Sequence, residues 1–271
     1  MYNSEAITSR DNARLKFVRR VRDGKETGHM FIEGVRLSGE ALSSSLRIVS
    51  CFVSEAFRRS SSFDAIGSKL RSRQIVFVLS ESLLDSISET KTPQGIVLVA
   101  ERQDPLQPRA LFSNVDTNLT LPIWIFLHEI NNPSNLGAVV RTAEAAGARG
   151  ILVSPRSADP CSPKALRASM GSAFRLPIVS GFPLEDVLST TKEEGIRVAA
   201  IDASGRSSYL DVDWQTPRLL IFGSEAEGLP KSILSLAEET IRIPMDGNVE
   251  SLNLAVSSGV ILFEAKRQNE A

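Results

Sequence analysis

The sequence predicts an α/β protein with a mainly parallel sheet in its C-terminal half and a smaller α/β unit before it. Short apolar runs alternate with longer helical patterns along most of the chain, which is typical of parallel strands joined by crossover helices. A content of 42% hydrophobic and 23% charged residues is ordinary for a soluble globular protein. The length of 271 residues gives room for two domains.

Residues 1–100 are predicted to form the smaller domain. Leu15, Val18 and Val21 recur at a constant short spacing and predict the apolar side of an amphipathic helix. Ser80 is a favourable N-cap for a helix over residues 81–88. The other elements expected here are a helix that begins at residue 35 and strands that end at residue 33 or span residues 48–53, 74–79 and 96–100.

Residues 101–121 are predicted to be a linker, because prolines and polar residues interrupt the pattern. Residues 122–271 then form the second domain. Its expected strands are 124–127, 150–154, 177–179, 197–201, 219–222 and 240–243, and its expected helices are 135–146, 163–170, 231–237 and 252–266. This alternation predicts a mainly parallel sheet with helices on both faces.

Other features exclude several classes of protein. No apolar stretch approaches the ~20 residues that span a bilayer, and the N-terminal residues lack the apolar core of a signal peptide. Cys51 and Cys161 are far apart in sequence and are expected to be unpaired thiols. His29 and His128 are the only histidines and suggest no metal site. We therefore expect a cytoplasmic protein with neither membrane nor metal among its partners.

The formal net charge of −1 conceals a local excess of basic residues. Five arginines and lysines stand between Arg10 and Lys25, opposed there by only Asp11 and Asp23. Such a cluster can neutralise several phosphates of a nucleic acid. The same charges would also suit the solvated side of a helix, so the cluster alone does not decide between these interpretations.

Three segments of the second domain each follow an expected strand and open into a polar loop with Gly or Pro. They are residues 131–141 (NNPSNLGAVVR), 221–230 (IFGSEAEGLP) and 243–253 (IPMDGNVESLN). An open α/β sheet forms its ligand crevice at such positions. Asn135 and Ser251 are candidate N-caps of the helices that follow. Arg141 stands among small and apolar residues and needs an acceptor, for which Glu225 is a candidate.

In residue type, order and spacing, these three segments resemble the SpoU (TrmH-like) branch of the SPOUT RNA methyltransferases. The resemblance covers roughly residues 122–268. A weaker similarity over residues 7–100, carried by FIEG at 31–34 and TPQG at 92–95, suggests the substrate-binding domain of the same enzymes, which resembles a ribosomal RNA-binding protein. The resemblance implies transfer of a methyl group from S-adenosylmethionine to a ribose 2′-hydroxyl, and a C-terminal trefoil knot that periodicity alone would not suggest.

The resemblance also assigns roles to individual residues. The positions that match the family's active site are Arg141, Asn135, Glu225, Ser251 and Asn253, with Arg141 in the role of activating the ribose hydroxyl. The positions that match its cofactor contacts are Gly223, Ile243 and Leu252, with Met245 as a neighbour. Recognition of the cofactor by backbone groups explains why no Gly-rich dinucleotide-binding fingerprint is present.

The implied partners are RNA and a second copy of the chain, since the family forms homodimers through the knotted domains. Arg10, Arg14, Lys16 and Arg20 are the expected phosphate contacts. The two-domain layout favours rRNA as substrate, with tRNA as the alternative. A non-catalytic RNA-binding or ribosome-assembly protein is a further alternative, whereas a nucleotide-binding oxidoreductase lacks its Gly-rich turn.

Overall fold

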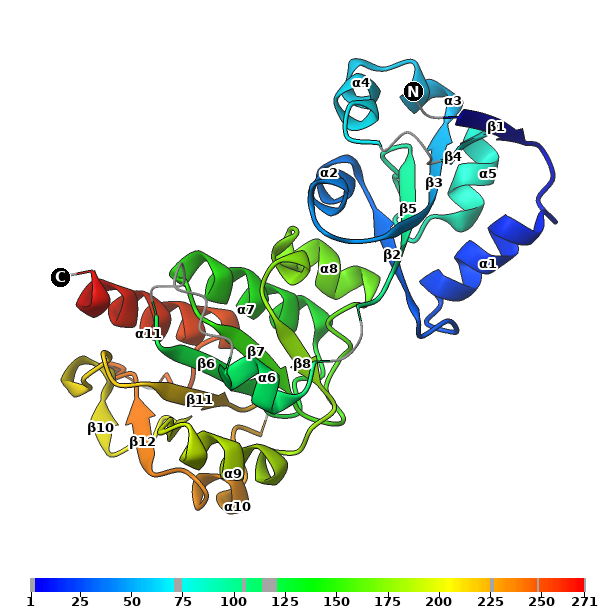
Figure 1. Cartoon of the computed structure of the whole chain (residues 1–271). Coiled ribbons are helices and arrows are strands. Elements are labelled where there is room, and N and C mark those ends of the chain that lie inside the picture. Colours follow the sequence, from blue (N-terminus) through cyan, green and yellow to red (C-terminus); the bar gives the residue numbers. More distant parts are fainter. Residues whose placement is uncertain are drawn as a thin grey trace. The chain divides into compact units, whose positions relative to one another are not determined.

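The computed structural model describes residues 3–70, 75–103, 106–113, 121–224, 227–247 and 249–270. The chain divides into two compact units, each with its own sheet (Figure 1). Unit 1 comprises Met1–Asp104 with Cys161–Phe174, and unit 2 comprises Pro105–Pro160 with Arg175–Ala271.

Unit 1 contains a five-stranded sheet of order β1-β4-β3-β5-β2. The strands are β1 (Asn3–Ile7), β2 (His29–Glu33), β3 (Ile48–Ser54), β4 (Ile75–Leu79) and β5 (Ile96–Glu101). Strand β5 is antiparallel to β2 and β3, whereas β4 is parallel to β1 and β3. The helices are α1 (Ala13–Arg22), α2 (Val35–Ser43), α3 (Glu55–Arg58), α4 (Ser61–Gly67) and α5 (Glu81–Ile87).

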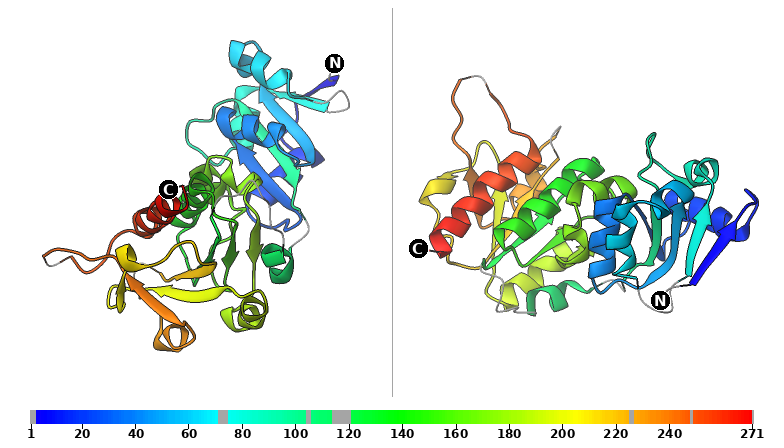
Figure 2. Two further views of the ribbon diagram at one scale, coloured as in Figure 1. Left: turned by 60° about the vertical axis from the view of Figure 1, so that its left-hand side comes forward. Right: turned by 90° about the horizontal axis from the view of Figure 1, so that it is seen from above.

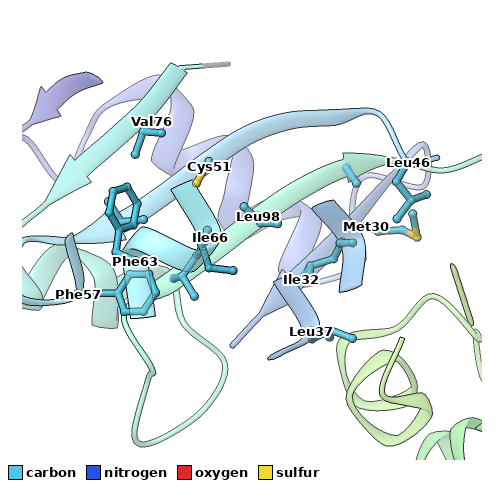
Figure 3. Close-up of a cluster of buried hydrophobic side chains, with 14 of the residues drawn as sticks. Met30, Ile32, Leu37, Leu46, Cys51, Phe57, Phe63, Ile66, Val76 and Leu98 are labelled. Carbon is cyan, nitrogen blue, oxygen red and sulfur yellow. The ribbon is translucent and has the colours of Figure 1, made fainter. Parts of the chain in front are cut away.

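Strands β2 to β5 of this sheet are buried on both faces, and their successive residues alternate between two apolar clusters. Cys51 and Val53 belong to the cluster beneath α2 and α4, whereas Phe52 belongs to the cluster beneath α1 and α5. Figure 3 shows the first cluster, with Phe57 and Phe63 beside Ile66. Burial on both faces explains why these strands read as continuous apolar runs rather than as an alternation.

Helix α8 (Pro163–Ser169) and the 3₁₀ helix η1 (Ser172–Phe174) complete unit 1 although they come much later in the sequence. Leu166 is fully buried and belongs, with Phe174, to the same apolar cluster as Met30 and Ile32 of β2. The predicted domain 122–271 includes this segment. The structure groups it with unit 1 instead, because its apolar side chains bury against that core, which periodicity alone cannot reveal.

Unit 2 contains a seven-stranded sheet of order β10-β12-β9-β11-β6-β7-β8, in which every pair of neighbouring strands is parallel. The strands are β6 (Ile123–Leu127), β7 (Gly150–Val153), β8 (Ile178–Ser180), β9 (Arg197–Ile201), β10 (Ser207–Ser208), β11 (Arg218–Phe222) and β12 (Glu239–Arg242). The predicted parallel sheet is therefore confirmed. Strand β11, late in the chain, lies between β6 and β9 at the centre of the sheet.

Helices cover both faces of this sheet. Helices α7 (Pro133–Ala146) and α11 (Leu254–Asn269) lie side by side on one face (Figure 2). Helices α6 (Pro108–Ser113), α9 (Leu184–Glu193) and α10 (Lys231–Leu234) bury Leu111, Val187 and Ile233 in one apolar cluster with Trp124 and Phe126 of β6 on the other face. This layered arrangement is the one that the alternating pattern predicted.

The segment predicted as the linker, residues 101–121, contains regular structure. Glu101 ends β5, and residues 108–113 form helix α6, whose Leu111 and Phe112 are almost fully buried in unit 2. Pro108 begins this helix, a position that proline favours because its ring fixes a helical φ. Residues 104, 105 and 114–120 of the predicted linker, like Gln74 of the predicted strand 74–79, lie outside the described residues.

The sequence also did not predict β1, α3, α4, α9 and β10. Helix α9 is polar overall, and its buried side is carried by Leu184, Val187 and Thr191, too few apolar residues to produce a clear pattern. Helices α3 and α4 span only four and seven residues, with one or two buried side chains each. Such elements form because tertiary burial stabilises them, not because their residues favour helix strongly.

Two predicted N-caps are displaced. Asn132, not Asn135, caps α7, and its side chain accepts a hydrogen bond from the Ser134 N–H at 2.9 Å. Pro133 then occupies the first helical position, where its missing N–H costs nothing. Asn253, not Ser251, caps α11 and accepts from the Ala255 N–H at 2.9 Å. In both cases an asparagine side chain satisfies one of the free N–H groups of the first turn.

The first prediction concerns the place of α8 in unit 1. Replacing Leu166 by Ala should lower the stability of unit 1 by about 2–5 kcal/mol, because it leaves a cavity in a closed core. Both tryptophans, Trp124 and Trp214, belong to unit 2, so their fluorescence reports that unit, whereas far-UV circular dichroism reports both. In urea, Leu166→Ala should shift the dichroism transition and leave the fluorescence transition in place. Lys164→Ala, at an exposed position of the same helix, is the control, and equal shifts in both signals would contradict the assignment.

The second prediction concerns the cap of α11. Asn253→Ala should lower the free energy of unfolding by about 1 kcal/mol, the usual cost of losing a side-chain cap. Ser251→Ala should change it by less than about 0.5 kcal/mol, as expected for an exposed residue outside the cap. Tryptophan fluorescence can follow both variants, because the Trp214 backbone N–H donates to the Gln268 side chain of α11. A larger loss in Ser251→Ala than in Asn253→Ala would restore the cap that the sequence suggested.

Candidate functional site

A cavity of about 330 Å³ lies at the carboxyl ends of β9, β11 and β12. Its lining consists of Ile201, Asp202, Ala203, Phe222, Gly223, Ser224, Gly228, Ile243, Met245, Glu250, Ser251, Leu252, Leu254 and Ser257. These residues come from loops that follow three neighbouring parallel strands and from the beginning of α11. An open parallel sheet binds ligands at this edge.

The cavity brings together five of the residues singled out by the sequence. Gly223, Ile243, Met245, Leu252 and Ser251 all contribute to its wall although they belong to two distant segments. Asn253 lies next to this group as the cap of α11, where its side chain oxygen is engaged by the Ala255 N–H. The second and third sequence segments therefore form one site.

Position 223 requires a glycine, because the loop that follows β11 folds back too closely for a side chain. A Cβ atom at this position would lie 2.3 Å from the Gly228 carbonyl oxygen. The loop returns here because the Gly228 N–H donates to the Ser224 carbonyl at 2.9 Å, closing an isolated antiparallel bridge. Gly228 itself has a φ of +65°, which suits glycine. The result is a wall of exposed backbone that a flat ligand can approach closely.

Several lining residues were missed by the sequence analysis. Asp202 and Ala203 follow the correctly expected strand 197–201, and Ser257 lies in the first turn of α11. The Asp202 carboxylate accepts hydrogen bonds from the Ser204 N–H and hydroxyl. The available signal was positional, since a residue that ends a parallel strand lies at the same sheet edge as the other site loops.

Arg141 and Asn135 belong to α7, which packs beside α11. Asn135 is half-buried in the first turn, whereas Arg141 is exposed. The apolar residues beside Arg141 in the sequence do not surround its side chain: Val139, Val140 and Ala143 face the protein interior and the guanidinium faces outward. Across the described part of the chain, Arg141 has no ion-pair partner. Glu225 lies outside the described residues, so its pairing with Arg141 stays a prediction.

The basic cluster of unit 1 separates into two groups. Arg19 and Arg22 donate to the carbonyl oxygens of Ser86 and Ser88 at the C-terminal end of α5, and so hold α1 against that helix. The four predicted RNA contacts are exposed instead: Arg10, Arg14, Lys16 and Arg20.

Three of these exposed residues have surface contacts with other side chains. The Arg14 guanidinium carbon lies 4.5 Å from the centre of the Phe77 ring. Lys16 pairs with Asp11 at 3.2 Å and Arg20 pairs with Glu26 at 2.7 Å. Exposed ion pairs of this kind contribute little to stability, so all four cations are available to an incoming phosphate.

The two short motifs of unit 1 meet in space. The Gln94 side chain accepts a hydrogen bond from the Val35 N–H at 2.8 Å and thereby caps α2. The Glu33 carboxylate is almost fully buried and accepts from the N–H groups of Glu89 and Thr90 at 3.0 and 3.2 Å, and from the Thr90 hydroxyl. These contacts fix the loop between α5 and β5 against β2.

Some features are absent from the part of the chain that the structure describes. No helix there combines the length and apolarity needed to cross a membrane. The same residues contain no cluster of three or more His, Cys, Asp and Glu side chains placed to bind a metal ion. Cys51 and Cys161 form no disulfide, and burial raises the pKa of the Cys51 thiol to about 12.

Known proteins resemble this chain over nearly its full length. A Synechocystis sp. protein described as an uncharacterized tRNA/rRNA methyltransferase, slr1673, is 29% identical, with 98% of this chain and 95% of that protein aligned. The crystal structure of an AdoMet-bound rRNA methyltransferase from Sinorhizobium meliloti superposes with a TM-score of 0.82 at 30% identity, covering 97% and 98% of the two chains. A solved RNA 2′-O ribose methyltransferase superposes with a TM-score of 0.78 at 28% identity, covering 98% and 100%.

Other curated relatives are longer. The aligned part spans 59–60% of the length of several mycobacterial tRNA/rRNA methyltransferases, at 32–34% identity. Two family models match separate parts of the chain. The model of the MRM3-like substrate binding domain matches residues 12–98. The model of the SpoU rRNA methylase family matches residues 122–263, just over half of the 271 residues. The resemblance inferred from the three segments is confirmed, and the chain belongs to the SpoU rRNA methylase family.

Proposed function

We propose that this protein transfers a methyl group from S-adenosylmethionine to a ribose 2′-hydroxyl of RNA, with rRNA as the favoured substrate. The observation that carries the proposal is the cavity at the ends of β9, β11 and β12, which gathers Gly223, Ile243, Met245 and Leu252. Two solved relatives support it: one is named as an AdoMet-bound rRNA methyltransferase and the other as an RNA 2′-O ribose methyltransferase.

The chemistry of the cavity wall fits S-adenosylmethionine. Gly223 lets the Gly228 backbone approach too closely for any Cβ atom, so main-chain groups of this loop form one wall of the cavity. Met245, Leu252 and Leu254 supply apolar surface, and the N–H and C=O groups of the loops supply hydrogen bonds to the polar edge of the adenine. When bound, S-adenosylmethionine supplies the electrophilic methyl group.

Arg141 is proposed to orient the ribose hydroxyl and to stabilise the negative charge that develops on its oxygen. An arginine is a poor general base because its pKa exceeds about 12. A fixed cation beside the reacting oxygen lowers the barrier without itself losing a proton. Asn135, Ser251 and Asn253 are proposed to place the ribose and its phosphate, together with Glu225. Holding the hydroxyl in line with the methyl group is a large part of such catalysis.

A homodimer through α7 and α11 is part of the proposal. Val256 and Phe263 are about half exposed on α11, and they lie seven positions apart, on one side of the helix. Arg141 is exposed on the neighbouring α7. A second copy that covers these apolar side chains would exclude water from the surroundings of Arg141 and strengthen its interactions. The trefoil knot also stays a prediction that follows from the family.

Unit 1 is proposed to bind the RNA. Exposed cations lie just before α1 and along it. They suit the phosphates of a single-stranded or looped RNA segment, in which a 2′-hydroxyl is accessible. A tRNA substrate is the second candidate, since the Synechocystis relative is described as a tRNA/rRNA methyltransferase.

The direct test is incubation of the purified protein with radiolabelled S-adenosylmethionine and unmodified rRNA or tRNA, followed by mapping of ribose methylation. Label at a 2′-hydroxyl of rRNA supports the proposal in full. Label in tRNA alone would retain the reaction and replace the substrate. RNA binding without methyl transfer would instead favour a non-catalytic ribosome-assembly role.

The third prediction separates catalysis from cofactor binding. Arg141→Ala should lower kcat for methyl transfer by at least about 100-fold, because it removes the charge that stabilises the developing alkoxide. The dissociation constant for S-adenosylmethionine should change by less than about twofold, because Arg141 does not line the cofactor cavity. Single-turnover methyl transfer and isothermal titration calorimetry measure the two quantities.

Two further variants control this experiment. Gly223→Ala should show the opposite pattern and weaken cofactor binding first, because its Cβ meets the Gly228 carbonyl. Arg109→Ala removes an exposed arginine of α6, which pairs with Glu193 at 3.9 Å on the face of the sheet opposite α7. This variant should retain both methyl transfer and cofactor binding. Full methyl transfer by Arg141→Ala would refute the proposed role.

The fourth prediction concerns RNA binding by α1. The double variant Arg10→Ala, Arg14→Ala should weaken RNA binding and reduce the slope of log K against log salt by roughly one for each phosphate that the variant no longer neutralises. Arg59→Ala, which removes an exposed cation at the end of α3, is the matched control. Electrophoretic mobility or anisotropy titrations over a series of salt concentrations measure the slope. An unchanged slope in the double variant would exclude α1 as the phosphate-binding helix.

A further inference from the structure

A second cavity in unit 2, of about 270 Å³, has no role in the function proposed above. It lies at the carboxyl ends of β6 and β7, beside the beginnings of α9 and α10. His128 and Glu129 follow β6, Arg156 follows β7, and Glu185 lies in the first turn of α9. Three prolines form much of the remaining wall.

This second cavity adjoins the first through the central strands of the sheet. The His128 N–H donates to the Phe222 carbonyl at 2.9 Å. Phe222 lines the first cavity and His128 lines the second. The loop after β11 connects them again, since Gly228 lines the first cavity and Pro230 the second. The two cavities therefore open at the same edge of the sheet, at the ends of neighbouring strands.

The polar groups of the second cavity are incompletely satisfied. The Nδ1 atom of His128 is buried and has no hydrogen-bond partner among the described residues. The Nε2 atom of the same ring lies 3.7 Å from the Glu129 carboxylate, which also pairs with the exposed Arg156. The Nδ1 atom has almost no accessible surface, so a ligand in the cavity would meet the remaining accessible part of the ring, beside the Glu129 carboxylate.

The backbone that presents these side chains is held in an unfavourable conformation. Glu129 and Arg156 have φ values of +52° and +64°, in the left-handed region that non-glycine residues seldom adopt. The Ser154 hydroxyl accepts a hydrogen bond from the Glu129 N–H at 2.8 Å and fixes the first of these turns. Strain of this kind persists where the surrounding structure over-determines it, and it concentrates at ligand sites.

The lining selects for a flat ligand that donates hydrogen bonds. Pro155, Pro183 and Pro230 offer rigid apolar surfaces, and Ile233 adds a further apolar surface. The carboxylates of Glu129 and Glu185 accept hydrogen bonds, and because Arg156 pairs with Glu129 the lining keeps the charge of one carboxylate in excess. An unstacked nucleobase has this combination of flat surfaces and N–H groups on its edge.

We propose that the second cavity receives one base of the RNA substrate, at or next to the methylated ribose, and that Glu129 and His128 read its N–H donors. The inference rests on the proposed methyl transfer to RNA, because it takes its ligand from that reaction. It assigns His128 and Glu129 to substrate specificity and not to the chemistry of transfer. Bases with an exocyclic amino group are preferred over uracil.

The first test does not require catalysis. The protein, with ¹³C-labelled isoleucine methyl groups and saturated with S-adenosylmethionine, is titrated with the four nucleoside 5′-monophosphates to about 10 mM, since a ligand of one nucleotide binds weakly. The Ile233 methyl resonance of the second cavity should shift with adenosine, cytidine and guanosine monophosphates and less with uridine monophosphate. The Ile243 resonance of the first cavity is the internal control.

Variants decide whether the shift reports the proposed contacts. Glu129→Gln and His128→Ala should abolish the Ile233 shift, whereas Glu193→Gln, an exposed carboxylate near the other end of α9, should retain it. No shift of Ile233 with any nucleotide, or an undiminished shift in Glu129→Gln, would overturn the proposal.

The second test, and our fifth prediction, measures methyl transfer to the RNA that the labelling experiment identifies. Glu129→Gln should lower kcat/KM for the RNA at least about fivefold, the effect expected when a hydrogen bond to a base is removed, and leave the affinity for S-adenosylmethionine unchanged. Equal kcat/KM in Glu129→Gln and the unaltered protein would refute base reading by this residue. If the unaltered protein transfers no methyl group, the proposed function fails, while the nucleotide titration still decides whether the cavity binds a base.

Discussion

The pairing of β11 with β6 is the constraint on which the site of unit 2 depends. Strand β11 enters the sheet late in the chain and lies between β6 and β9. Its hydrogen bonds continue beyond the strands, where the His128 N–H meets the Phe222 carbonyl. Because all the strands are parallel, the loops after β6, β9, β11 and β12 leave from one edge. That edge is the switch point at which such sheets form crevices.

The sequence predicted the central strands of both sheets because they are buried on two faces and read as apolar runs. Helix starts were less predictable. Asn132 and Asn135 are both plausible caps in NNPSN, and the choice depends on Pro133, which suits the first helical position. Ser251 and Asn253 are likewise both possible caps in ESLN. The helix begins at Leu254, which is buried, so Asn253 is the cap.

The candidate site was predictable where a family resemblance assigns positions and unpredictable where tertiary contacts decide. The resemblance to the SpoU family assigned Gly223 and Ile243 to one cofactor site, and both line one cavity. Arg141 is exposed because the opposite side of α7 packs against the protein, and its apolar neighbours in the sequence gave no sign of this. Likewise, Leu166 looks like any buried leucine, and only the fold assigns it to unit 1.

The distribution of charge shows how a protein with a net charge of −1 can bind a polyanion. Arg19 and Arg22 are engaged in holding α1 to α5, and the exposed cations that remain lie along one helix of unit 1. Two carboxylates, Glu129 and Glu185, lie instead around the second cavity, where they can accept hydrogen bonds from a base. In nucleic-acid recognition, phosphate contacts position the chain and base contacts specify it. Our proposals give the first task to the cations of unit 1 and the second to the cavity of unit 2.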